Sequence, residues 1–193
     1  MKRFYIAERF SFDLDPETED NQIVDDDLSA LSKKYKYFPK TKEELQNLVD
    51  ELIKERGNEA DLNDIYTGYV TDMSELFKYR SDFNGDISGW DVSNVKNMSK
   101  MFYYCKSFNQ DISGWDVSSV EDMSAMFHHC KSFNQDIRYW NVSKVKNMKY
   151  MFYYCESFNS NLSHWDVSSV EDMSGMFAYC PLPEENRPKF KNL

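Results

Sequence analysis

The sequence predicts an α/β repeat solenoid, a stack of rungs that each hold one short strand and one short helix. The first observation is a period of 25 residues through the second half of the chain. Within the period 108–132, apolar residues from Val120 onward have the spacing of one helical face. Before them, Trp115 and Val117 alternate around a polar residue, as strand residues do. Because such a rung cannot bury its own apolar side, neighbouring rungs must stack to form a core.

Columns of equivalent residues define the period. All four tryptophans and all four cysteines of the chain lie one period apart. A degenerate copy, with Ile65 at the Trp position, precedes the others, so we predict five rungs over residues 58–182. The columns that we expect to be buried include Phe83, Phe108, Phe133 and Phe158; Trp90, Trp115, Trp140 and Trp165; Val95, Val120, Val145 and Val170; Met98, Met123, Met148 and Met173; and Cys105, Cys130, Cys155 and Cys180.

The segments outside the rungs have different compositions. Residues 39–57 form a predicted capping helix, in which Thr41 and Glu44 make a capping box and Gly57 ends the helix. It covers the first rung or, alternatively, binds a partner. Residues 1–38 are an acidic N-terminal extension, interpreted either as a partly ordered tail or as a docking segment that mimics an anionic surface. Residues 183–193 form a C-terminal tail that seals the last rung.

Composition excludes several classes of function. The 193 residues carry 23 Lys and Arg against 33 Asp and Glu, a formal net charge of −10, so we expect no nucleic-acid partner. No apolar run is long enough to cross a membrane. The first 15 residues lack the apolar stretch of a secretory signal, so we expect a cytoplasmic protein.

No residue pattern indicates a reaction centre or a cofactor. The cysteines are spaced by 25 residues rather than in close pairs, which does not fit a zinc site. Stacking would allow disulfides, but we expect reduced, buried thiols. His128 and His129 lie beside no carboxylate fixed by spacing, so we predict no metal. The column Asn84, Asn109, Asn134 and Asn159 is expected to form a buried amide ladder.

Charge alternates from rung to rung along one column. Lys96, Glu121, Lys146 and Glu171 lie one period apart. We expect them to form one outward row in which neighbouring head groups pair, because stacked like charges would repel. Rungs 83–107 and 133–157 are net basic, and rungs 108–132 and 158–182 are net acidic.

The motif FNQDISGWDVSSVEDMSAMF and its repeats resemble the BspA-like leucine-rich-repeat proteins, including the 25-residue repeats of mycoplasma-type surface lipoproteins. The segment PKTKEELQNLVDELIKERGNEADLNDI is similar to the lead-in of such proteins, and the resemblance covers about residues 39–180. It implies a leucine-rich-repeat-like solenoid with a role in protein recognition or surface attachment. It also implies the alternative location, on the cell surface or secreted without a classical signal.

We therefore predict a non-enzymatic protein-recognition module, a monomer or weak homo-oligomer whose protein partner is not identified. The alternatives are a structural, self-assembling or adhesive protein, and a hydrolase that uses Asp86, Asp111 and Asp136. The repeated carboxylates fit turn caps better than a hydrolase.

The predicted binding residues follow from the expected helix. If Met98, Met101, Phe102 and Cys105 form its buried stripe, Tyr103 and its neighbour point outward. The same two columns contain the predicted partner-binding residues Tyr103, Tyr104, His128, His129, Tyr153, Tyr154 and Tyr179. Alternatively, these rings only cover the edges of the core. The rival site is the opposite strand face, Ser88, Ser113, Arg138 and Ser163, where leucine-rich-repeat proteins usually bind.

Overall fold

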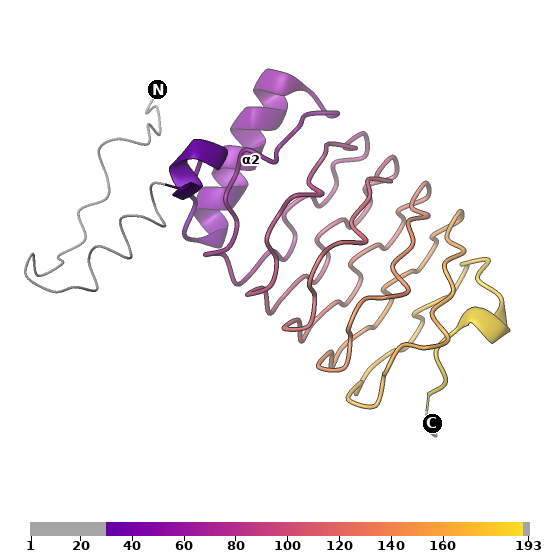
Figure 1. Ribbon diagram of the computed structural model, residues 1–193. Helices are drawn as coiled ribbons and strands as arrows, with labels where there is room; N and C mark the ends of the chain where they lie inside the picture. The colour runs from indigo at the N-terminus through magenta and orange to yellow at the C-terminus, as the bar shows by residue number, and fades with distance from the viewer. Residues whose placement is uncertain (1–29, 191–193) are drawn as a thin grey trace, which may run out of the picture.

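The computed structural model describes residues 30–190 of the chain. The 25-residue repeats form rungs that lie side by side along one axis (Figure 1). Helix α2, Lys42–Arg56, lies at the N-terminal end of the stack, and the 3-10 helix η1, Glu184–Asn186, lies at the other end. Residues 30–34 are also helical. Most of the predicted acidic extension, residues 1–29, lies outside the described residues.

Helix α2 confirms the predicted helix before the first rung. The Thr41 side chain caps it by accepting a hydrogen bond from the Glu44 N–H at 3.2 Å. The Glu44 carboxylate accepts from the Lys40 N–H rather than from the Thr41 N–H, so the capping box is shifted by one residue. Gly57, with φ 88°, ends the helix. Its buried face joins the same apolar core as the rungs and consists of Leu45, Leu48, Val49, Leu52 and Ile53.

The predicted fold class, an α/β repeat solenoid of leucine-rich-repeat type with a strand and a helix in each rung, is wrong. Within residues 30–190, the rungs contain no helix. Their β-type pairing is limited to isolated parallel bridges, such as those of Asn97 with Asp72 and with Asp122. Turns fill most of each rung instead.

Left-handed backbone residues explain why the expected helices do not form. In rung 83–107, Lys100 and Tyr104 have φ values of 56° and 63°, whereas a helix needs about −63°. The N–H groups of Met98, Lys100, Phe102 and Tyr104 donate to carbonyls of the next rung at 2.8–2.9 Å. The N–H groups between them close tight turns within the rung. Backbone hydrogen bonds therefore run from rung to rung and not along a helix.

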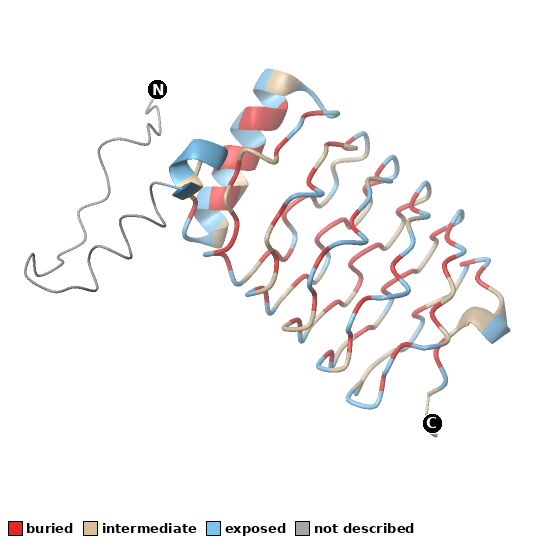
Figure 2. Cartoon of the chain, viewed as in Figure 1, coloured by how far each residue is buried: buried red, intermediate tan, exposed pale blue. Residues whose placement is uncertain are grey.

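Burial of the predicted columns is confirmed in the interior of the stack. The Phe column is fully buried, the four Trp residues are at most 5% exposed, and all four cysteines are buried. Figure 2 shows that buried positions recur from rung to rung. Phe102 stacks on Phe108, at the start of the next rung, with ring centroids 3.9 Å apart, and on its own equivalent one period later, Phe127, at 5.6 Å. The exceptions are in the last rung, where Val170 and Met173 are only partly buried.

Polar atoms of the buried columns bond to the preceding rung. The Trp115 Nε1–H donates to the Ile87 carbonyl at 3.2 Å, and the Cys130 thiol donates to the Phe102 carbonyl at 2.9 Å. The other three tryptophans repeat the first contact, and Cys105 and Cys155 repeat the second. Each of these carbonyls also accepts from a backbone N–H, so loss of one ring or thiol would remove one of its two hydrogen bonds.

Asp and Asn side chains hold the turns. The Asp86 carboxylate accepts from the N–H of Ser88, and the Asn97 amide oxygen accepts from the N–H of Ser99, each two residues later. Such bonds recur in every rung and explain the richness in Asp, Asn and Ser. The predicted Asn ladder also forms, with the Asn109 N–H donating to the Asn84 Oδ1 at 2.9 Å. It is not buried as expected, since Asn109 and the next two members are exposed.

Candidate interaction surfaces

Two columns of stacked rings cross the rungs on one side of the molecule. The first column holds Tyr103, His128 and Tyr153, with ring centroids 4.5 Å and 4.7 Å apart. The second holds Tyr104, His129, Tyr154 and Tyr179, at 4.2, 4.7 and 4.3 Å. Tyr79 begins both columns through edge and tilted contacts with the first two tyrosines. We call these eight residues the Tyr/His surface.

Most rings of the Tyr/His surface stack face to face with their neighbours one period away. The interior members are half-buried, whereas the end members Tyr79 and Tyr179 are 65% and 66% exposed. The side chains of these residues point outward as predicted, but the cause is not a helix. Each rung contributes two consecutive residues to this surface, such as Tyr103 and Tyr104. The backbone of the second residue is left-handed, with φ 63° at Tyr104 and 56° at Tyr154, and this conformation places both side chains on the surface.

The two histidines lie at the middle of this surface and bond to each other. Their Nδ1 atoms are 2.9 Å apart, so one ring donates and the other accepts. Burial, with a smaller contribution from His129, lowers the pKa of His128 to about 4, and burial also lowers the pKa of His129. Both imidazoles are therefore neutral at pH 7. Residues 30–190 contain no cluster of three or more His, Cys, Asp or Glu that could hold a metal ion.

The rival strand face lies at the Asx turns. The backbone N–H groups of Ser88, Ser113, Arg138 and Ser163 donate to the Asp or Asn two residues before them. The Arg138 Nε–H also donates to the Asp136 carboxylate at 2.8 Å. Sequence reasoning missed Tyr139, which is 85% exposed and lies 5.9 Å from the Arg138 guanidinium. The signal was present, because this rung alone replaces Ser-Gly or Ser-His with Arg-Tyr.

The charge column forms as one exposed row. The N–H groups of Glu121, Lys146 and Glu171 each donate to the carbonyl of the preceding column member at 2.7–2.8 Å. The Lys146 ammonium contacts the Glu121 carboxylate at 2.6 Å, and this hydrogen bond lowers the pKa of Glu121. The predicted pairing is thus confirmed for Glu121 and Lys146.

Neither the cysteines nor the Asp column have the properties of reacting groups. The four thiols are free and buried, and burial raises the pKa of Cys105 to about 12. Hydrogen bonds from Ser88, Ser113 and Arg138 lower the pKa values of Asp86, Asp111 and Asp136. A general acid at neutral pH would need a raised value.

The chain matches the model of a known family. The family described as "Mycoplasma protein of unknown function, DUF285" matches residues 43–142 and 71–190, which together span helix α2 and all the rungs. The chain belongs to this family. The expected similarity to mycoplasma-type repeat proteins is confirmed to that extent, whereas the assignment to BspA-like proteins stays a prediction. No curated protein and no solved structure matches the chain. Among the described residues, no helix is both long and apolar enough to span a membrane.

Proposed function

We propose that this chain is a non-enzymatic protein-recognition module that binds its partner through the Tyr/His surface. The observation that carries the proposal is the continuity of the two columns from Tyr79 to Tyr179 across all five rungs. The core does not require these ring types, because the neighbouring Phe and Trp columns are already buried beneath the turns.

The stacked rings suit binding for an energetic reason. A tyrosine offers apolar area with a polar tip, and it is enriched at protein interfaces. Here the rings are already held by their neighbours at 4.2–4.7 Å, so a partner orders few side chains on binding. The neutral His128 and His129 can also be covered without removing a charge from water.

The test is a matched set of three variants. The double variant Tyr103→Ser/Tyr153→Ser removes two rings of the first column, and Tyr103→Phe/Tyr153→Phe keeps the rings without their hydroxyl groups. Arg138→Ser changes the strand face to the residue found in three other rungs. Partners captured by the unmodified chain from its native cell would be identified, and their affinity for each variant measured.

We expect the Ser double variant to weaken binding by about tenfold or more, since each buried interface tyrosine contributes about 1 kcal/mol or more. Arg138→Ser should leave affinity unchanged. Melting temperatures of the three variants, each above the temperature of the binding assay, show that folding is retained. The reverse pattern would move the site to Arg138 and Tyr139. Loss of a homo-oligomer in the Ser double variant would favour self-assembly instead.

A further inference from the structure

Four backbone N–H groups of each interior rung point at the next rung. In rung 108–132 they belong to Met123, Ala125, Phe127 and His129, and they donate to carbonyls of rung 133–157 at 2.8–3.0 Å. The same four bonds join every neighbouring pair of rungs. A row of donors on one rung is thus always met by a row of carbonyls on the following one.

Rung 158–182 has the same row of donors, and residues 183–190 do not form a further rung over it. Its members are Met173, Gly175, Phe177 and Tyr179, and no backbone carbonyl among residues 30–190 accepts from them. Gly175 and Tyr179 have φ values of 66° and 57°, as their equivalents in other rungs do, so the backbone keeps the donor orientation. An open row of backbone donors is a template for pairing with another chain segment.

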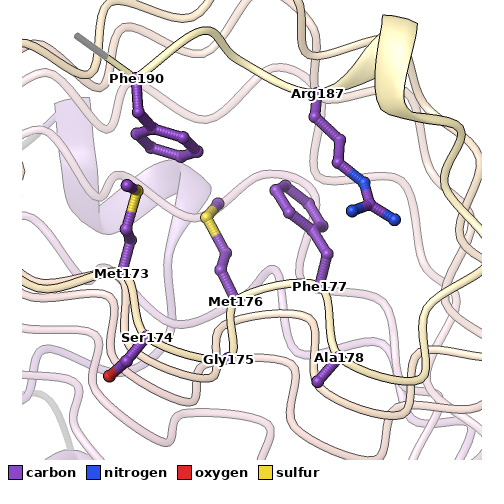
Figure 3. Close-up of a pocket in the computed structure, with 8 residues that line it drawn as sticks. All are labelled: Met173, Ser174, Gly175, Met176, Phe177, Ala178, Arg187 and Phe190. Carbon is purple, nitrogen blue, oxygen red and sulfur yellow. The ribbon is translucent and has the colours of Figure 1, made fainter. Parts of the chain in front are cut away.

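Apolar side chains surround this row. Met173, Met176 and Phe177 line a shallow cavity of about 370 Å³ at the C-terminal end (Figure 3). Figure 3 shows Phe190 beside Met173 and Arg187 beside Phe177, so the tail crosses this end. The Arg187 guanidinium lies 5.3 Å from the Phe177 ring. The described part of the tail therefore covers part of the apolar surface but supplies no backbone acceptor to the four N–H groups.

Charge indicates what fits against this end. Rung 158–182 carries three acidic residues and no basic one, and the interior acidic rung 108–132 packs against the basic rung 133–157. Glu121 in that interior rung pairs with Lys146 of the basic rung. Glu171 occupies the equivalent place in the last rung and is exposed. The acidic rung at the open end is therefore complementary to a basic segment, although Arg187 of the tail also lies at this end, against Phe177.

We propose that the C-terminal end of the stack binds an extended, basic polypeptide segment, whose carbonyls accept from the four N–H groups as the next rung would. This site is distinct from the proposed Tyr/His surface. Tyr179 belongs to both, because its ring is part of the Tyr/His surface and its N–H is part of the donor row. A second copy of the chain fits less well. Its own first-rung edge, around Asp72 and Ser74, is in contact with Lys42 of helix α2.

The probe is a peptide with the sequence of a segment that already accepts these hydrogen bonds from an acidic rung within the chain. Residues 143–156, SKVKNMKYMFYYCE, supply the carbonyls that meet the acidic rung 108–132. A peptide of this sequence, with serine for its cysteine, is added to the full chain. The matched control peptide is the acidic counterpart, residues 118–131, SSVEDMSAMFHHCK, also with serine. Amide hydrogen exchange is followed by NMR for the row in the last rung and for the equivalent row in rung 133–157.

We expect the basic peptide to slow exchange of the four last-rung amides by about tenfold or more, because exposed amides exchange without protection. Amides of the interior row are protected already and should not change. Glu171→Lys should weaken binding of the basic peptide about two- to fivefold, the range of one exposed ion pair. Glu51→Lys, the same charge change on helix α2, should not weaken it.

Three results would overturn the proposal. The first is unchanged exchange of these amides at the highest soluble concentration of basic peptide. The second is equal protection by the acidic peptide, which would remove the role of charge. The third is protection that rises with protein concentration when no peptide is present, which would assign this end to a second copy of the chain.

Discussion

Two aromatic columns run along the same stack, one through its interior and one over its surface. In the interior, Phe102 and its equivalents repeat the same residue in all rungs. On the surface, the equivalents of Tyr103 change from tyrosine to histidine and to alanine. Both sets stack with the 25-residue period, yet only the interior set is enclosed by other side chains.

The difference shows which positions of the 25-residue repeat must keep the same residue type. A buried position must hold a ring of fixed size, because interiors are close-packed and a change of volume leaves a cavity. A surface position needs only a side chain that can lie against its neighbour, as the tyrosine and histidine rings do at 4.5 Å. Packing therefore constrains the residue types of the Tyr/His surface less than those of the core, and they can vary to suit a binding partner.

The largest expected effect is the difference in stability between loss of a buried ring and loss of a surface ring. Trp140→Ala should destabilise the fold by about 3–5 kcal/mol, because it opens a cavity and removes the hydrogen bond from Nε1–H to the Ile112 carbonyl. Tyr153→Ala, on the surface, should cost about 1 kcal/mol, the value of a stacking contact. Urea unfolding of both variants measures the difference. Equal losses would show that the surface rings are part of the core after all.

An intermediate effect concerns the histidine at the centre of the surface column. The pKa of His128 is lowered to about 4 from an ordinary value of 6.5. The unfolded chain therefore takes up a proton below pH 6.5 that the folded chain does not, so stability falls as pH drops from 6.5 to 4. Because the ring is half exposed, we expect a loss of at most about 2 kcal/mol over this window.

His128→Phe keeps the stacked ring and removes this titration. Urea unfolding at several pH values should show a flatter stability profile for the variant between pH 6.5 and 4. The Asp side chains with lowered pKa values, such as Asp111, lose their contribution below this window and affect both proteins equally. Parallel profiles over the whole range would mean that the pKa of His128 in the folded chain is not lowered.

The period predicted the buried columns, because stacking alone decides which side chains lie inside. Periodicity could not distinguish a helix from successive turns, since both place Val120, Met123 and Phe127 on one side. The decisive feature is left-handed backbone at Lys100 and Tyr104, residue types that seldom adopt it.

One glycine in the sequence indicates the left-handed backbone. Gly175 is equivalent to Lys100 and Ala125, and all three are left-handed in the structure. A glycine in a column that otherwise predicts helix is a weak signal when seen once. The open donor row of the last rung was beyond sequence reasoning for the same reason, because it exists only if backbone bonds run between rungs.

The smallest expected effect tests the exposed charge row, which belongs to neither aromatic column. Lys146→Glu replaces the contact with Glu121 by a run of three carboxylates at positions 121, 146 and 171. Rungs are separated by about 4.8 Å, so the new neighbours repel, but solvent limits the loss to about 1 kcal/mol. The melting temperature should fall by about 2–4 °C.

Salt separates this electrostatic loss from a packing defect. Added salt screens exposed charges, so the loss caused by Lys146→Glu should shrink as ionic strength rises. Lys146→Gln removes the attraction without adding repulsion, and its melting temperature should lie between the other two. Since the Lys146 N–H still donates to the Glu121 carbonyl in each variant, the stacked backbone is unchanged. A loss that persists at high salt would show that the Lys146 side chain stabilises the row through packing of its aliphatic stem rather than through its charge.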